Sequence, residues 1–149
     1  MQDLDDYLAH LPHQPPMRLV EHIVELLPGT RARTTRVARS GDWYFDGHFP
    51  GQPVVPAVAL VELLAQTGGL AASAAGDSGV NQMRLGALGN FKFPAAAVPG
   101  VLLEATADVV GRMGSLIKIA GTVTADGRLV ATGSLTLASV DRSDDSRTS

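Results

Sequence analysis

Cysteine is absent from the 149 residues, so the chain has neither a disulfide framework nor a thiolate nucleophile. Charged residues make up only 18% of it and the net charge is -3, which leaves no basic surface for a nucleic acid. The longest apolar run, residues 54–75, is interrupted by Glu62, Gln66 and two glycines, so we expect no membrane span. The acidic amino terminus lacks the order of a signal peptide. These absences predict a cytoplasmic protein.

The hydrophobic share, 45%, suits one globular domain with a single core. We place this domain at residues 1–140. Residues 141–149, DRSDDSRTS, are polar and repetitive, and we expect them to be disordered.

The apolar spacing indicates one long helix with antiparallel strands before and after it. Residues 3–11 are expected to form a short amphipathic helix, and residues 18–27 and 30–39 to form two strands around a Pro-Gly turn. Because no alternation of strand and helix follows, we predict an α+β domain in which a curved sheet wraps one helix. The remaining strands are expected at residues 85–93, 101–112, 115–124 and 128–137.

Residues 48–66, HFPGQPVVPAVALVELLAQ, join a turn to a helix that is apolar almost all the way round, which is typical of a fully buried helix. Pro56 is well placed at the helix start, where its missing N–H costs nothing. Glu62 and Gln66 lie four residues apart, so they share one helical face. A carboxylate among apolar side chains is costly unless it is paired, which indicates a specific role for Glu62.

The turn and the helix together supply the groups needed to remove a proton next to a carbonyl. His48 could act as a base, Glu62 as an acid, and the free N–H groups of Ala57 and Val58 lie at the electropositive helix start. A solvated histidine and a structurally buried glutamate would each explain one residue. Neither explains why both adjoin the same helix start.

Three segments of the chain resemble the FabZ-type 3-hydroxyacyl-(acyl-carrier-protein) dehydratases. GHFPGQPVVPAVALVELLAQ resembles their active-site pattern GHFPGxPxxPGVLxxExLAQ, and LPHQPPMRLVEHIVEL and NFKFPAAAVPG resemble two further segments, so the likeness covers residues 11–137. The resemblance implies a hot-dog fold, in which a curved antiparallel sheet wraps around one long central helix. It implies conversion of a 3-hydroxyacyl thioester on acyl carrier protein to the trans-2-enoyl thioester, in fatty-acid or polyketide synthesis, without metal or cofactor.

By this resemblance, His48 and Glu62 are the catalytic pair, contributed by different subunits of a homodimer or of a dimer-based hexamer. The N–H of Ala57, with Val58 beside it, would stabilise the enolate-like oxygen. Ala57 stands where the family has glycine, which keeps the N–H but adds a methyl group beside that oxygen.

Three further residues are expected to serve the substrate site. Gln66 would orient Glu62 by a hydrogen bond, or would simply be a satisfied polar group of the core. Phe49 and Phe91, in the segments that resemble the family, are expected to contact the substrate. The aromatic residues Trp43, Tyr44, Phe45 and Phe49 would either wall an acyl tunnel or close the end of the core.

Two other functions remain open at this point. A hot-dog thioesterase would use a carboxylate at a helix but usually lacks the turn that carries His48. A non-catalytic acyl-binding subunit is the other, and Ala57 is its only indication.

Two groups of basic residues have plainer explanations than binding sites. The arginines at 18, 31, 33, 36 and 39 could dock an acidic carrier protein, but their spacing favours a solvated strand face. His10, His13 and His22 lack the accompanying ligands of a metal site. We expect a structural role for His13.

Overall fold

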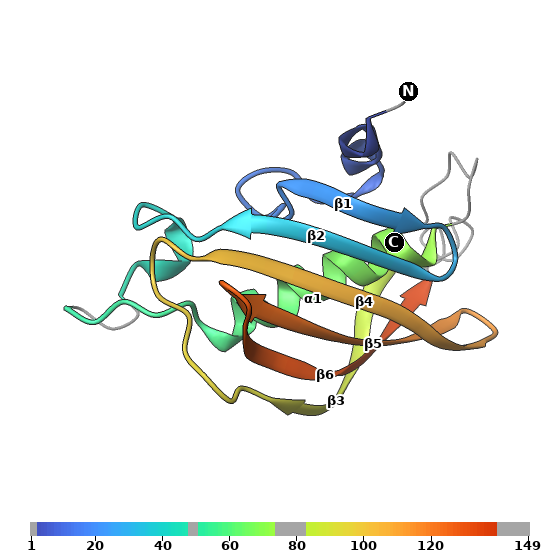
Figure 1. Cartoon of the computed structure of the whole chain (residues 1–149). Coiled ribbons are helices and arrows are strands. Elements are labelled where there is room, and N and C mark those ends of the chain that lie inside the picture. Colours follow the sequence, from blue (N-terminus) through green and yellow to red (C-terminus); the bar gives the residue numbers. More distant parts are fainter. Residues whose placement is uncertain (1–2, 48–50, 74–82, 140–149) are drawn as a thin grey trace, which may run out of the picture.

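A computed structural model describes residues 3–47, 51–73 and 83–139. Its six strands form one antiparallel sheet in the order β1-β2-β4-β5-β6-β3, and the single long helix α1 (Ala57–Ala72) lies against one face of this curved sheet (Figure 1). The strands are β1 (His22–Leu27), β2 (Arg31–Val37), β3 (Met83–Lys92), β4 (Leu102–Met113), β5 (Leu116–Ala125) and β6 (Arg128–Ser139).

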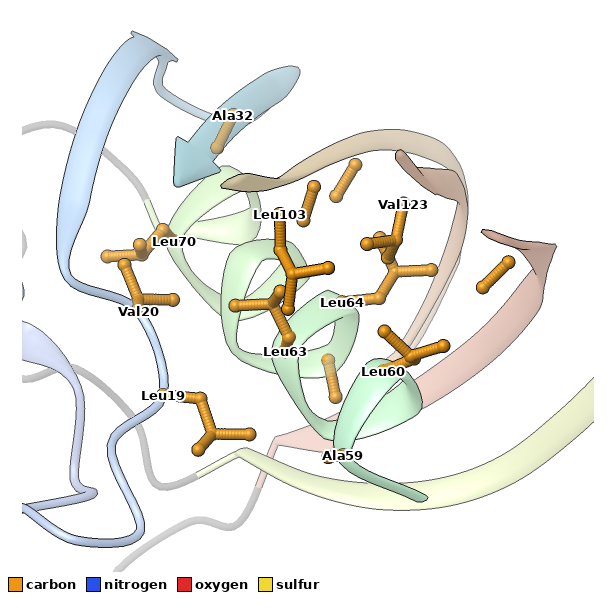
Figure 2. Packing of buried hydrophobic residues seen from close by; sticks show 14 of the residues in the cluster. Leu19, Val20, Ala32, Ala59, Leu60, Leu63, Leu64, Leu70, Leu103 and Val123 are labelled. Carbon is orange, nitrogen blue, oxygen red and sulfur yellow. The ribbon is translucent and has the colours of Figure 1, made fainter. Parts of the chain in front are cut away.

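Helix α1 supplies the centre of the core. Its leucines at 60, 63, 64 and 70 are almost fully buried and pack among sheet residues such as Leu103 and Val123 (Figure 2). Burial of each such side chain favours folding by about 1.5–3 kcal/mol. The expectation of a helix enclosed by a sheet is therefore confirmed. Within the described ranges, no helix is long and apolar enough to cross a membrane.

The two edges of the sheet are finished differently. The 3-10 helix η1 (Leu4–His10) lies beside β1 (Figure 1), and the Asp5 carboxylate accepts a hydrogen bond from the N–H of Ile23 over 2.7 Å. At the other edge, β3 pairs with β6 alone among the described strands and exposes Leu85 and Leu88, which are 42% and 56% accessible. Uncovered apolar edges of this kind invite pairing with another chain.

The predicted elements are present, with three differences. The first strand begins at His22 because the N–H groups of Leu19 and Val20 bond to the side chain of Gln66 rather than to a strand. The amino-terminal helix is a 3-10 helix, and Pro56 is the N-cap of α1 rather than its first helical residue. The tail at residues 141–149, which was expected to be disordered, lies outside the described residues.

Candidate active site

Gln66 is the polar centre of the site. It is 2% exposed, and its Oε1 accepts hydrogen bonds from the N–H groups of Leu19 (2.8 Å) and Val20 (3.4 Å). Its Nε2 donates to the carbonyl of Met17 over 2.7 Å and to Glu62 Oε1 over 3.0 Å. Gln66 thus satisfies its own buried groups and also makes the hydrogen bond to Glu62 that an orienting role requires, and that role stays a prediction.

Glu62 lies one turn before Gln66 on α1, and its side chain is 28% exposed. Nε2 of His13 lies 3.2 Å from Glu62 Oε1. His13 comes from the segment between η1 and β1, far from Glu62 in the sequence. Sequence reasoning missed this contact, because nothing in the spacing of the two residues indicates that they meet.

A pocket of about 60 Å³ adjoins this cluster. Its polar side is formed by His13, Glu62 and Gln66, with Ser73 further along the helix. The pocket therefore places one carboxyl group at the side of an otherwise hydrocarbon-lined space. Its apolar lining consists mainly of Leu11, Ala65, Leu70, Met83, Leu85 and Leu137.

The start of α1 lies at the surface of the described chain. Helical bonding begins with the N–H groups of Ala59 and Leu60, which donate to the carbonyl of Pro56. The preceding segment is fixed because the N–H of Val55 donates to the carbonyl of Ala97 over 2.8 Å. Ala57 and Val58 have exposed side chains, 75% in the case of Val58, at the positive end of the helix dipole.

The chain matches known proteins over most of its length. Residues 11–134 match the family model of the FabA-like domain. Over 140 residues the chain is 34% identical to the 3-hydroxyacyl-(acyl-carrier-protein) dehydratase FabZ of Roseiflexus sp., which covers 93% of this chain and 96% of that protein. The FabZ of Herpetosiphon aurantiacus is 36% identical over 143 residues, or 95% of this chain and all of the relative. The chain belongs to the FabZ-type dehydratase family.

A solved structure supports the fold of this FabZ-type chain independently. The dehydratase heterocomplex ApeI:P from Xenorhabdus doucetiae superimposes with a TM-score of 0.71 at 16% identity, covering 93% of each chain. At this identity the likeness concerns the fold alone. It confirms the hot-dog fold that the sequence resemblance implied.

The structure describes some, but not all, of the site residues that the FabZ resemblance implies. His48 and Phe49 lie outside the described residues, so their roles stay predictions. Phe91 lies on β3, where its ring stacks at 6.0 Å from that of Phe93 and covers Gly133 of the neighbouring strand. Its contact with a substrate also stays a prediction, since the pocket beside Glu62 is lined by other residues of β3.

The aromatic residues Trp43–Phe45 are anchored by a cluster of hydrogen bonds and an ion pair around Asp42. Tyr44 and Phe45 belong to the buried core, whereas Trp43 is exposed. This burial favours the alternative in which the aromatic residues close the end of the core over the one in which they wall an acyl tunnel. The Tyr44 hydroxyl donates to Asp42 over 2.6 Å, and burial together with this bond raises the pKa of Tyr44 to about 12.

Asp42 is the charged member of that cluster. Burial raises its pKa, but the bonds from Tyr44 and from the N–H of Arg39, with the charge of Arg36 at 3.1 Å, outweigh burial and hold the pKa below its usual value. The cluster therefore favours an ionised Asp42, which ties the aromatic segment to β2.

The strand arginines are largely paired with carboxylates, which favours a mixed-charge strand face over a basic docking surface. Arg36 differs from the others because its side chain is only 12% exposed. The pairs are Arg31 with Glu25 and Asp108, Arg33 with Glu104, Arg36 with Asp42, and Arg39 with Glu21.

Proposed function

We propose that this protein dehydrates a 3-hydroxyacyl thioester carried on acyl carrier protein to the trans-2-enoyl thioester, as a step of fatty-acid synthesis. The observation that carries the proposal is the Glu62 carboxyl, which accepts a hydrogen bond from Gln66 and lies 3.2 Å from His13, at the edge of an apolar pocket in a FabZ-type chain. An apolar pocket accommodates an acyl chain, and a positioned carboxyl can protonate the hydroxyl group that must leave.

The reaction divides between two residues. His48 takes the C2 proton, which the thioester carbonyl makes acidic, and the electron pair of that bond forms the C2–C3 double bond. Glu62 gives its proton to the 3-hydroxyl, so that the C3–O bond breaks and water leaves. The proton on His48 then returns to Glu62 through solvent. Each proton transfer by a positioned side chain contributes roughly 10²–10⁴-fold to the rate.

The helix start supplies the electrostatic part of the proposal. As C2 loses its proton, negative charge develops on the thioester oxygen. The N–H groups of Ala57 and Val58 belong to the first turn of α1, where the orphan donors and the helix dipole favour an anion. Phe49 and Phe91 are proposed to contact the substrate beside this oxygen.

We further propose that two subunits combine to complete each site. The pocket beside Glu62 is walled on one side by Met83 and Leu85 of the edge strand β3. A second copy that pairs along this edge would reach the pocket and bring its His48 to Glu62. Such a homodimer is also the repeating unit of the expected hexamer.

The test is turnover of a 3-hydroxyacyl carrier-protein thioester, with products identified by mass spectrometry. We expect enoyl thioester from the wild type, loss of turnover in His48→Ala, and at least about a hundredfold lower kcat in Glu62→Gln. Near-normal activity of His48→Ala would remove the base assignment. Release of free acid would identify a thioesterase, and binding without turnover would identify an acyl-binding subunit.

A further inference from the structure

The segment that carries His13 is held rigidly against α1. Residues between η1 and β1 form neither helix nor strand, but Gln66 bonds to Leu19, Val20 and Met17 of this segment from its buried position. A tight turn between Gln14 and the next residues adds two backbone bonds to the carbonyl of Gln14, at 2.8 and 3.0 Å. His13 therefore approaches Glu62 from a fixed backbone.

Both contacts of the Glu62 carboxyl with described residues involve the same oxygen. Oε1 lies 3.0 Å from the donor Nε2 of Gln66 and 3.2 Å from Nε2 of His13. The carbonyl oxygen of a carboxylic acid has two lone pairs and accepts two hydrogen bonds. The protonated oxygen instead carries an O–H group, which is a hydrogen-bond donor. Gln66 therefore donates to Oε1, and the His13 ring lies close enough to the same oxygen to be a second donor, which would leave the acidic proton of Glu62 on Oε2.

The second ring nitrogen of His13 indicates which form of the ring makes this contact. Nδ1 is buried and has no hydrogen-bond partner among the described residues. In the neutral ring with hydrogen on Nε2, Nδ1 is a bare acceptor. A second proton would leave a charged N–H buried and unpaired, which costs more than an unpaired lone pair. The neutral Nε2–H form fits both nitrogens.

We propose that His13 is a positioning residue for the dehydration: its Nε2–H donates to Glu62 Oε1 and, with Gln66, keeps the proton on Oε2, from which it passes to the leaving hydroxyl. This inference rests on the proposed function. His13 itself neither gains nor loses a proton in the reaction.

Two substitutions at position 13 show whether His13 acts as a hydrogen-bond donor or only fills space. His13→Leu removes the donor, and we expect kcat to fall about tenfold or more with KM within about twofold, since a hydrogen bond to a charged or acidic group is lost. His13→Gln restores an amide N–H near the position of Nε2 and should recover kcat to within about threefold of wild type. Unchanged kcat in His13→Leu, or no recovery in His13→Gln, overturns the proposal.

A double-mutant cycle asks whether His13 acts through Glu62. In a Glu62→Gln background there is no acidic proton to direct, so adding His13→Leu should lower the residual kcat by less than about twofold. The same tenfold loss in both backgrounds would show a structural role and overturn the proposal. His22→Leu is the matched control, because this exposed histidine contacts Asp5 instead and should leave kcat unchanged.

One measurement is independent of activity. Nitrogen-15 NMR of the imidazoles, assigned with the His13 and His22 variants, should show hydrogen on Nε2 of His13 and a bare Nδ1, with the Nε2 signal shifted in Glu62→Gln. Hydrogen on Nδ1 instead overturns the proposal. If the wild type releases no enoyl product, the proposed function fails, and this spectrum still decides whether His13 donates to Glu62.

Discussion

Gly121 lies where the sheet packs tightly against its helix. It lies on β5 between Ala107 and Gly133 of the neighbouring strands. A Cβ atom there would come within 2.7 Å of the Leu64 side chain on α1 and would overlap the carbonyl oxygen of Thr106. Leu64 is fully buried, so neither neighbour has space to move away.

Replacing Gly121 by alanine should therefore destabilise the protein by about 1–3 kcal/mol or more, as overpacking of a tight core does. Chemical denaturation followed by circular dichroism measures the change. Gly111→Ala is the matched control, since a Cβ at Gly111 meets only the Cβ of Lys118 at an ordinary 3.9 Å. Equal stability of both variants would contradict the close packing of α1 on β5.

Some of the site could be predicted at the residue scale and some could not. The shared face of Glu62 and Gln66 followed from helical periodicity, and their 3.0 Å contact agrees with it. The contact of Glu62 with His13 was missed because the chain between them returns through two strands. Spacing along a sequence describes one element and carries no information on which elements meet.

At the scale of elements, the amino-terminal helix η1 is fastened to β1 by one carboxylate. Asp5 accepts from the N–H of Ile23 and lies 2.8 Å from Nδ1 of His22. The hydrogen bond that His22 donates to Asp5 raises the pKa of His22 above 6.5, and the bonds that Asp5 accepts from His22 and Ile23 lower the pKa of Asp5 below 3.8. The ion pair therefore stabilises the packing of η1 on β1 most at pH values between 3.8 and 6.5.

The pH dependence of this fastening follows from the two directions. Stability from the raised His22 pKa is complete below 6.5 and is lost as the pH rises through the raised value. Stability from the lowered Asp5 pKa is present above 3.8 and is lost as the pH falls through the lowered value. Salt should weaken both contributions, because His22 is well exposed.

Replacing Asp5 by asparagine should return the pKa of His22 towards 6.5, because its hydrogen-bonded counter-charge is lost. An NMR titration of the imidazole measures the shift, and faster exchange of the Ile23 amide would report the lost backbone bond. Asp6→Asn is the control, a neighbouring carboxylate on the same short helix. A His22 pKa unaffected by Asp5→Asn would contradict the pairing.

Element types were predictable here because the periods of helix and strand differ and the turns contain glycine or proline. The ends of elements were less so. The first strand looked longer because Leu19 and Val20 are apolar, yet their N–H groups are taken by the side chain of Gln66. A long-range bond from a side chain ended the strand, and local pattern cannot show that.

At the scale of the whole molecule, the two sheet edges have different consequences. The β1 edge is fastened to η1, whereas β3 carries exposed leucines and also walls the pocket beside Glu62. A single subunit therefore leaves the proposed active site next to an uncovered edge. Pairing of two subunits along β3 would bury that edge and complete two symmetric sites.

Subunit complementation tests this arrangement directly. If each site takes His48 from one subunit and Glu62 from the other, a mixed dimer of His48→Ala and Glu62→Gln has one site with both defects and one intact site. Random pairing makes half of the dimers mixed, so co-expression should restore about a quarter of wild-type activity per subunit. Each variant alone should remain inactive or nearly so.

The control co-expresses His48→Ala with the double variant that carries both substitutions, a mixture that cannot form an intact site in any pairing. Two affinity tags on the two chains allow the mixed dimers to be isolated before assay. Isolated mixed dimers without activity above this control would contradict shared sites, because a site built within one chain carries a defect in every subunit. Recovered activity in the mixed dimers alone would require that His48 reach Glu62 across the subunit boundary, which makes pairing of the subunits a condition of catalysis.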